Sequence, residues 1–359
     1  MYKVFYLDDE KADLIDPIVS KLRSTGELDV IWEKPVSFEA ELDVLETRLK
    51  DYNALFLDLQ LNGDQEDGTK VKYQAPPLAQ MVRTLATEKK ITDIPIFLCS
   101  TDDRIKDSYK RDFTSHDLFD WTFLKNEISD KTVSKICSII EGYKKINERP
   151  KDFNTLLGRD YDTVDDRILS RFINEENPPV HEIARVIFKD VVQPSGVLIS
   201  EQILAARLGI DVGKSDDWPI VRDTLFSKAK YTGVFCESWE RWWSDLVNEI
   251  FAEKTNEQLA SLDAAERVAF LIPIASEKIV AATPIKFNSS TNFWTICAST
   301  KQPLDPFEGF KIDMKLEPKA WQDYSYVSFY ALIERLATRD GIVLHPSEVR
   351  RYESEAAEM

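Results

Sequence analysis

Four short apolar runs near the start of the chain each lead into residues that could bind a metal ion or hold an anion. Carboxylate oxygens are the ligands that Mg²⁺ prefers in proteins, while a hydroxyl and an ammonium group can donate hydrogen bonds to anionic oxygens. The residue types at these four positions, and their order along the chain, therefore predict a site at which carboxylates bind a cation beside groups that hold an anion. The residues are Asp8 and Asp9 after the run at 3–7, Asp58 after 54–57, Ser100 after 94–99, and Lys125 after 121–124.

The run at 54–57 predicts a buried strand of a parallel sheet, because such strands are covered on both faces. An unpaired carboxylate at the end of a buried strand would be costly unless the function required it there. In open α/β sheets, sites form beyond the carboxyl ends of the strands. Since the other three runs also read as strands, we expect their terminal residues to collect around Asp58.

Segments with helical periodicity alternate with these strands. The alternation predicts an α/β doubly wound parallel sheet of five strands. Pro76 and Pro77 predict an interruption of the third helix, since proline removes a backbone donor and clashes in a helix interior. The remaining strand is expected at 28–32, and the helices at 11–25, 38–49, 78–88 (with Met81 facing inward), 102–117 and 130–143.

The acid pair, lone acid, hydroxyl and lysine at four successive strand ends resemble the receiver domain of bacterial response regulators. The resemblance covers residues 1–147. It implies that Asp58 accepts a phosphoryl group from a histidine kinase or phosphotransfer protein, with Ser100 and Lys125 holding the phosphoryl oxygens. It also implies a Mg²⁺ ion bound by Asp8, Asp9, Asp58 and the backbone carbonyl of Gln60.

The chain departs from the pattern of that family at several positions. Asn126 follows Lys125 where the family usually has a proline, and Thr122 stands where a switching aromatic residue often lies. Thr101 replaces a small residue, and the acidic loop at 59–67, before Gly68, is longer than usual. The chemistry of the acceptor is therefore expected to be intact, while the route by which a signal would spread is open.

Composition sets the broad class of the protein. The chain has 359 residues, enough for two domains, with 43% hydrophobic and 30% charged residues, as in soluble globular proteins. Its formal net charge is −17. An acidic balance argues against non-specific binding to nucleic acid or to anionic membranes, which rely on basic patches.

The remaining composition predicts a cytoplasmic protein. The four cysteines are far apart and read as free thiols in a reducing compartment, and the three histidines form no metal motif. The chain begins directly with a strand-like run, so no signal peptide is expected. No apolar run approaches the length of a membrane span.

Residues 148–359 are expected to form a mostly helical α+β domain of unknown output, with protein binding favoured. A well-signalled helix at 200–210 followed by 218–230 has the shape of a helix-turn-helix, which keeps a DNA-binding regulator as an alternative. Against it, Asp216 and Asp217 open the second segment, where DNA phosphates would lie. Further helices are expected at 164–172, 181–191 and 323–338, strands at 270–274, 284–287 and 293–297, and a frayed tail from 353.

The most aromatic stretch of this half is the tryptophan-rich segment at 238–247. Trp239, Trp243, Leu246 and Ile250 fall on one stripe of a predicted helix, which reads either as core or as a partner-binding face. We find no nucleophile elbow, glycine-rich phosphate loop or zinc-protease motif, so no enzyme activity is expected beyond self-catalysed phosphorylation and dephosphorylation of Asp58.

The sequence thus predicts a two-component response regulator that signals through a C-terminal protein-interaction domain. Two alternatives stay open: the DNA-binding regulator, and a receiver that only removes phosphoryl groups from a relay, for which a bacterial defence system is a candidate setting. A homodimer is also left open.

Overall fold

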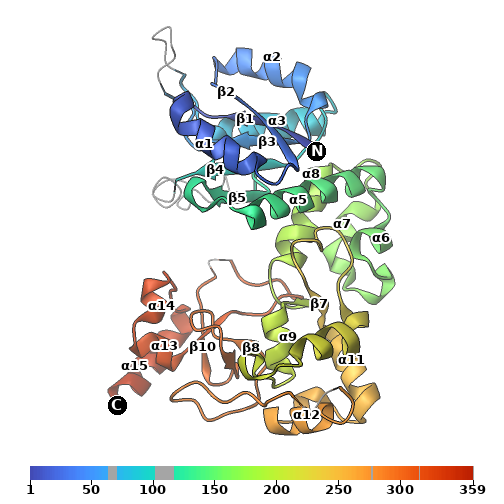
Figure 1. The fold of residues 1–359 in the computed structure, drawn as a ribbon, viewed down its shortest axis with the longest axis vertical. Helices are drawn as coiled ribbons and strands as arrows, with labels where there is room; N and C mark the ends of the chain where they lie inside the picture. Colours follow the sequence, from blue (N-terminus) through green and yellow to red (C-terminus); the bar gives the residue numbers. More distant parts are fainter. Residues whose placement is uncertain (64–70, 102–116, 276–277, 315, 359) are drawn as a thin grey trace. The chain divides into compact units, whose positions relative to one another are not determined.

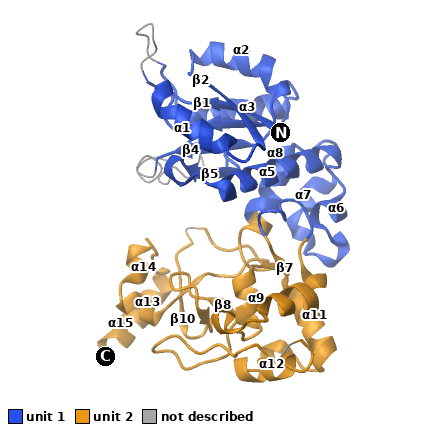
Figure 2. Cartoon of the chain, in the orientation of Figure 1, with its two compact units in different colours: residues 1–189, 232–239 blue, residues 190–231, 240–359 orange. Residues whose placement is uncertain are grey.

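The computed structural model describes residues 1–63, 71–101, 117–275, 278–314 and 316–358, and the chain forms two compact units. The first unit comprises residues 1–189 and 232–239, and the second comprises 190–231 and 240–359 (Figure 2). The chain therefore passes between the units after residues 189, 231 and 239. The expected domain boundary after residue 147 remains a prediction, while the first compact unit itself continues to Lys189.

A five-stranded parallel sheet forms the centre of the first unit (Figure 1). Its order is β2-β1-β3-β4-β5, the order of flavodoxin-like doubly wound sheets, so the predicted fold class is confirmed. The order reverses between β1 and β3, and such sheets place their sites beyond the carboxyl ends of the strands at this reversal. The strands are β1 (Tyr2–Leu7), β2 (Leu28–Glu33), β3 (Ala54–Leu57), β4 (Ile96–Ser100) and β5 (Trp121–Leu124).

Alternation of side chains gives the sheet two faces that are covered by different helices. Phe5, Leu55 and Ile96 lie in a core cluster with side chains of α2 (Phe38–Arg48) and α3 (Ala75–Thr87). The opposite face carries Tyr6 and Phe56, whose ring centroids are 6.1 Å apart. The helix α5 (Asp130–Glu148) covers this opposite face, and α1 (Ala12–Arg23) joins β1 to β2.

The third helix begins earlier than the sequence predicts. Pro76 and Pro77 lie in the first turn of α3, where a missing N–H removes no intrahelical bond. The predicted interruption before residue 78 is therefore wrong. Met81, predicted to face inward, is 37% exposed. The helix expected at 102–117 and the turn at Gly68 lie outside the described residues.

Three short helices complete the first unit. They are α6 (Phe153–Leu157), α7 (Ser170–Ile173) and α8 (Val180–Arg185), and a π-helical turn at Val186–Val192 follows α8. The helix predicted at 164–172 is thus reduced to α7 and short 3₁₀ turns.

Residues 232–239 return to the first unit and pack against α5. A Cβ atom on Gly142 of α5 would lie 2.2 Å from the ring of Phe235, so only glycine leaves room for this ring. Trp239 makes an edge contact with Trp121 of β5, with ring centroids 6.2 Å apart. Phe188 contacts Phe235 and Trp239 at 5.2 and 4.6 Å between ring centroids. This returning segment is therefore part of the core of the first unit.

The second unit is rich in helices and carries small two-stranded sheets, as the α+β prediction for this half requires. Two of its buried clusters consist of side chains from residues 199–279 and from residues 285–337. Among the described residues, no helix combines the length and apolar character needed to cross a membrane. The helices are α9 (Glu201–Arg207), α10 (Trp218–Ile220), α11 (Ser244–Thr255), α12 (Ala264–Leu271), α13 (Phe329–Ile333), α14 (Leu336–Arg339) and α15 (Val349–Ala357).

The small sheets pair strands in an antiparallel manner. They consist of β6 (Leu198–Ile199) with β7 (Trp242–Trp243), β8 (Thr295–Ile296) with β9 (Pro303–Leu304), and β10 (Gly309–Lys311) with β11 (Tyr326–Ser328).

The predicted tryptophan stripe is wrong. Trp243 belongs to strand β7 and α11 begins only at Ser244, because backbone pairing with β6 holds this stretch extended. Trp239 belongs to the first unit instead. The predicted strand at 270–274 is also wrong, since a capping box between Asp263 and Glu266 starts α12 upstream and carries it into this stretch.

Other predictions for this half are met only in part. The strand at 293–297 is confirmed as β8, whereas Phe287 has a φ of 73° and residues 284–287 form no strand. The helix at 323–338 is split into β11, α13 and α14, with a break at Arg335, whose φ is 56°. The tail forms helix α15 rather than a frayed end.

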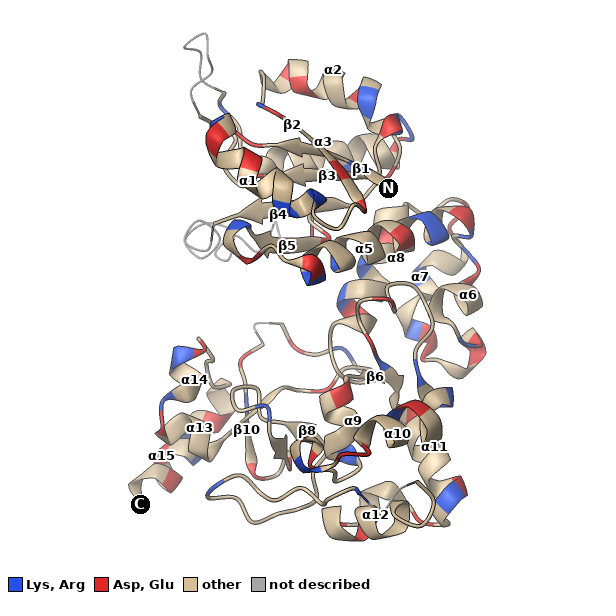
Figure 3. Cartoon of the chain, viewed as in Figure 1, with Lys and Arg blue, Asp and Glu red and all other residues tan. Residues whose placement is uncertain are grey.

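The segment weighed as a helix-turn-helix has no long second helix. Ser200 caps α9 as predicted, accepting a hydrogen bond from the backbone of Ile203 at 3.4 Å. The following helix α10 has three residues and continues as a π-helical turn at Val221–Leu225. In Figure 3, acidic and basic residues are interspersed along the elements of both units. Neither observation favours binding to DNA.

Candidate metal and anion site

Three aspartates converge at the carboxyl ends of β1 and β3. One carboxylate oxygen each of Asp8, Asp9 and Asp58 lies within 4.8 Å of the others, and Asp8 and Asp58 are fully buried. Parallel pairing of β1 with β3 sets this geometry, because Leu7 lies opposite Leu57 and the next residues leave the sheet together. The oxygen donor set fits a hard divalent cation such as Mg²⁺.

Lys125 brings a positive charge to two of these acids. Its Nζ lies 2.7 Å from Asp8 Oδ2 and 2.8 Å from Asp58 Oδ1. Burial alone would lower the pKa of Lys125, but the two carboxylates outweigh it and raise this pKa above its usual value. The two carboxylates therefore favour the charged form of Lys125.

The surroundings of Asp58 shift the pKa of its carboxyl in opposite directions. Burial raises the pKa of this carboxyl, Lys125 acts in the opposite direction, and Asp8 adds to the increase, so the net change is upward. A divalent cation would favour the charged form of Asp58.

Backbone groups fix the orientation of both buried carboxylates. The N–H of Gln60 donates to Asp58 Oδ2 at 3.0 Å, and the N–H of Glu10 donates to Asp8 Oδ1 at 3.1 Å. Gln60 also forms an isolated antiparallel bridge with Gln74, which ties the loop after β3 to the start of α3. The structure thus places the N–H of Gln60 beside Asp58, while the role of the Gln60 carbonyl as a metal ligand stays a prediction.

Ser100 ends β4 at the same edge of the sheet. Its side chain is fully buried, and its Oγ has no hydrogen-bond partner within the described part of the chain. Buried hydroxyl groups are rarely left without a partner. A buried hydroxyl of this kind is available to donate to an anion at the site.

The sequence reasoning missed three neighbours of the aspartates. The hydroxyl of Tyr6 donates a hydrogen bond to Asp8 Oδ2, and the indole Nε1 of Trp32 donates to the Asp8 carbonyl at 3.1 Å. A Cβ atom on Gly63 would lie 2.6 Å from Asp9 Oδ2, so the loop after β3 approaches this acid closely. The available signal was Tyr6, a residue with a polar tip two positions before Asp8 and on the same side of the strand.

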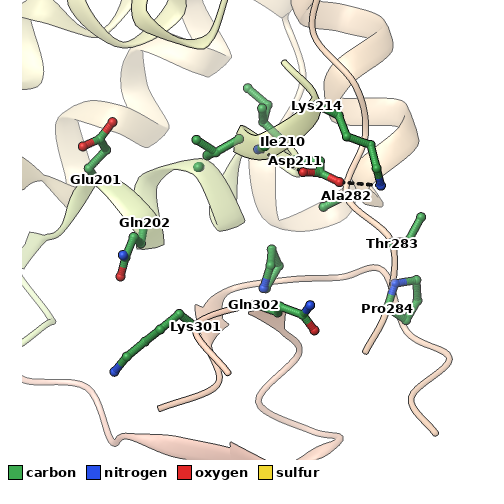
Figure 4. Close-up of a pocket in the computed structure, with 14 residues that line it drawn as sticks. Glu201, Gln202, Ile210, Asp211, Lys214, Ala282, Thr283, Pro284, Lys301 and Gln302 are labelled. Carbon is green, nitrogen blue, oxygen red and sulfur yellow. Dashed lines mark hydrogen bonds and ion pairs between the residues drawn. The ribbon is translucent and has the colours of Figure 1, made fainter. Parts of the chain in front are cut away.

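The second unit contains a cavity of about 470 Å³, lined partly by α9 (Figure 4). Lys214 Nζ pairs with Asp211 Oδ2 at 2.8 Å, and Glu201 accepts a hydrogen bond from Arg222 at 2.6 Å. A further charged residue of the lining, Lys301, donates to the carbonyl of Ala298 at 2.6 Å.

No protein-family model matches the chain, and no curated protein matches it. Among solved structures, a response regulator receiver domain protein from Clostridium thermocellum is similar at 10% identity and a TM-score of 0.30, over 41% of this chain and 99% of that one. The Mn²⁺-bound form of the response regulator Rcp1 is similar at 15% identity and a TM-score of 0.24, over 42% and 96% of the two chains.

The RcsB response regulator of Salmonella typhimurium is similar at 14% identity and a TM-score of 0.22, over 50% of this chain and 96% of that one. At these identities the comparisons assign no role to any residue. The proposals below therefore depend on the geometry of the site.

Proposed function

We propose that the first unit is a phosphoacceptor, with Asp58 as the residue that receives the phosphoryl group. The observation that supports this most is the pairing of Asp58 with Lys125 at 2.8 Å, inside a cluster of three aspartates at the reversal point of the sheet. A buried acid held in this way is costly unless the function needs it.

Each residue has a defined part in the proposed transfer. An Asp58 carboxylate oxygen forms a bond to phosphorus while the P–N bond of a phosphohistidine donor breaks, and the donor histidine leaves. Lys125 neutralises one phosphoryl oxygen, and the Oγ–H of Ser100 donates to another. Asp8, Asp9, Asp58 and the Gln60 carbonyl would hold Mg²⁺, which supplies charge neutralisation when bound.

The donor in this proposal is a histidine kinase or a phosphotransfer protein, and the setting is the cytoplasm. Phosphorylation would change how the C-terminal half binds a protein partner or a second copy of the chain, as in a response regulator. The competing role is that of a receiver that only removes phosphoryl groups from a relay.

Phosphorylation by a small donor tests the proposal. Acetyl phosphate with Mg²⁺ should add one phosphoryl group to the whole chain, detected by intact mass, and hydroxylamine should remove it because an acyl phosphate is labile. Asp58→Asn should give no adduct, whereas Asp51→Asn, at an exposed carboxylate before β3, should react like wild type. Absence of an adduct with acetyl phosphate and with phosphoramidate would overturn the proposal.

The phosphorylated and unphosphorylated samples also distinguish a switch from a receiver that only removes phosphoryl groups from a relay. A change in oligomeric size or partner binding on phosphorylation supports a switch. A phosphoryl adduct without either change supports a receiver that only removes phosphoryl groups from a relay.

A further inference from the structure

Tyr6 is the fifth of the six residues of β1, and its hydroxyl reaches the acid cluster. The side chain is fully buried in β1. Its hydroxyl donates to Asp8 Oδ2, the oxygen that also pairs with Lys125 at 2.7 Å. One oxygen of Asp8 thus has two side-chain donors.

Side chains of strands β3 and β4 restrict the position of the Tyr6 ring. Phe56 of the neighbouring strand meets it edge-on at 69° between ring planes, with 6.1 Å between ring centroids. The Sγ of Cys99 in β4 lies 3.8 Å from the hydroxyl oxygen. Because the ring is buried and enclosed, the hydroxyl stays directed at Asp8.

In the described part of the chain, the other carboxylate oxygen of Asp8, Oδ1, has fewer hydrogen-bond donors around it than Oδ2. Asp8 Oδ1 accepts one backbone hydrogen bond, from Glu10 at 3.1 Å. A carboxylate oxygen can accept about two hydrogen bonds or ligand contacts. Among the residues that the structure describes, Asp8 Oδ1 therefore keeps a free direction, while Tyr6 and Lys125 restrict rotation of the carboxylate.

We propose that Tyr6 is a positioning residue for the divalent cation, acting through Asp8. This inference rests on the proposed function, since it assumes that the aspartates bind a metal ion. Groups that hydrogen-bond to metal-ligating carboxylates fix their orientation, and their removal weakens metal binding by about 10- to 100-fold. We expect Tyr6→Phe, which keeps the ring and removes only the hydroxyl, to weaken Mg²⁺ and Mn²⁺ binding by about tenfold or more.

Tyr2 provides a matched control on the same strand. Its hydroxyl donates to a carboxylate oxygen of Glu141 at 2.8 Å, at the opposite end of β1. Tyr2→Phe removes the same type of hydrogen bond without touching the aspartates. We expect this variant to bind metal like wild type.

The experiment is a calorimetric titration of the whole chain with Mg²⁺ and with Mn²⁺, for wild type and both variants. Weaker binding in Tyr6→Phe alone supports the inference. Binding within twofold of wild type in Tyr6→Phe overturns it and leaves the proposed function standing. No metal binding by wild type removes the basis of both the inference and the proposed function.

Two further measurements distinguish positioning from a general loss of packing. Phosphorylation by acetyl phosphate should need a higher Mg²⁺ concentration in Tyr6→Phe but reach a near-wild-type rate at saturation, which a misfolded variant would not do. In the background of Asp8→Asn, the effect of Tyr6→Phe on metal affinity should vanish, because coupled residues are not additive. An unchanged effect in that background contradicts action through Asp8.

Discussion

Lys125 pairs with two buried carboxylates, those of Asp8 and Asp58, and offsets part of their negative charge. Removing one partner of a buried ion pair typically costs about 3–5 kcal/mol, because the remaining charge is left unpaired. We expect Lys125→Met to lower the free energy of unfolding by this amount and to slow phosphorylation of Asp58. Thermal unfolding with and without Mg²⁺ checks the cause, since a bound cation should restore part of the loss.

Lys145→Met is the control for this variant. Lys145 pairs with Glu237 at 2.7 Å, but both side chains are more than 40% exposed. Exposed pairs contribute about 0–1 kcal/mol. A loss in Lys125→Met no larger than in Lys145→Met would contradict the structural role of Lys125.

Ser100 leads to an unusual expectation, because its buried hydroxyl has no hydrogen-bond partner within the described residues. Removing a satisfied buried hydroxyl leaves its partner unpaired and costs about 1–3 kcal/mol. Ser100→Ala should instead leave the free energy of unfolding unchanged or raised, and should slow phosphoryl transfer. Ser328→Ala, which removes a buried hydroxyl bonded to the Ala331 N–H at 3.3 Å, should destabilise. Denaturant unfolding and adduct kinetics measure the two effects, and a destabilised Ser100→Ala would contradict this account.

The sequence was sufficient to predict which strand ends meet, because apolar runs followed by polar residues mark parallel strands that share one edge. Asp8, Asp58 and Lys125 were found together for this reason. Tyr6 and Gly63 were missed because their contacts depend on the length and path of other segments. A tyrosine in a strand reads as ordinary core until the position of its hydroxyl is known.

At the scale of the elements, one buried network joins α3, β5, α5 and α8 at the far end of the sheet. Arg83 pairs with Asp120 at 2.6 Å and with Asp93 at 3.3 Å. Tyr143 donates to Asp120 at 2.6 Å, and His181 lies 2.8 Å from Asp93. This network anchors α8 to the five-stranded sheet.

The network predicts part of the acid sensitivity of the protein. Burial would raise the pKa of Asp93, but hydrogen bonding to His181 and the charge of Arg83 lower it overall. A carboxyl with a lowered folded pKa stabilises the fold above its unfolded pKa of about 3.9, and this stabilisation is lost as pH falls through the folded pKa. We expect Asp93→Asn to lose less free energy of unfolding than wild type below about pH 4. Urea unfolding at several pH values measures this, and parallel pH profiles would contradict it.

Gly142 predicts a second effect at this scale. Glycine inside a helix is normally about 1 kcal/mol less favourable than alanine. Here a Cβ atom would lie 2.2 Å from the ring of Phe235, so Gly142→Ala should destabilise the first unit and raise hydrogen exchange in residues 232–239. Phe235→Ala combined with Gly142→Ala should relieve the clash. Unchanged exchange in the single variant would show that the segment does not depend on this contact.

Element prediction succeeded where local pattern and tertiary structure agree, as for β1, β3 and α5. It failed for Trp239 and Trp243, because a helical period was overridden by pairing of β7 with β6 and by packing on the first unit. It also failed at Pro76 and Pro77, because prolines that interrupt a helix interior are well accommodated in a first turn.

At the scale of the whole molecule, the first unit depends on a segment that lies far along the chain. A chain cut after residue 189 lacks residues 232–239 and leaves Phe188 without its ring contacts to Phe235 and Trp239. We expect fragment 1–189 to unfold at a lower temperature than the same unit in the whole chain. Adding a peptide of residues 232–239 should raise this temperature, and a fragment as stable as the whole chain would contradict the assignment of the segment to the core.

The return of residues 232–239 also has a consequence for the order of events during synthesis. The first unit cannot be completed when residue 189 leaves the ribosome, because fifty more residues, through 239, must follow. At about 5–20 residues per second, the Phe235 and Trp239 sites stay uncovered for roughly 3–10 seconds. During this interval the nascent chain exposes apolar surface that a chaperone or a neighbouring chain can bind, and slowing translation between residues 190 and 239 would prolong the exposure.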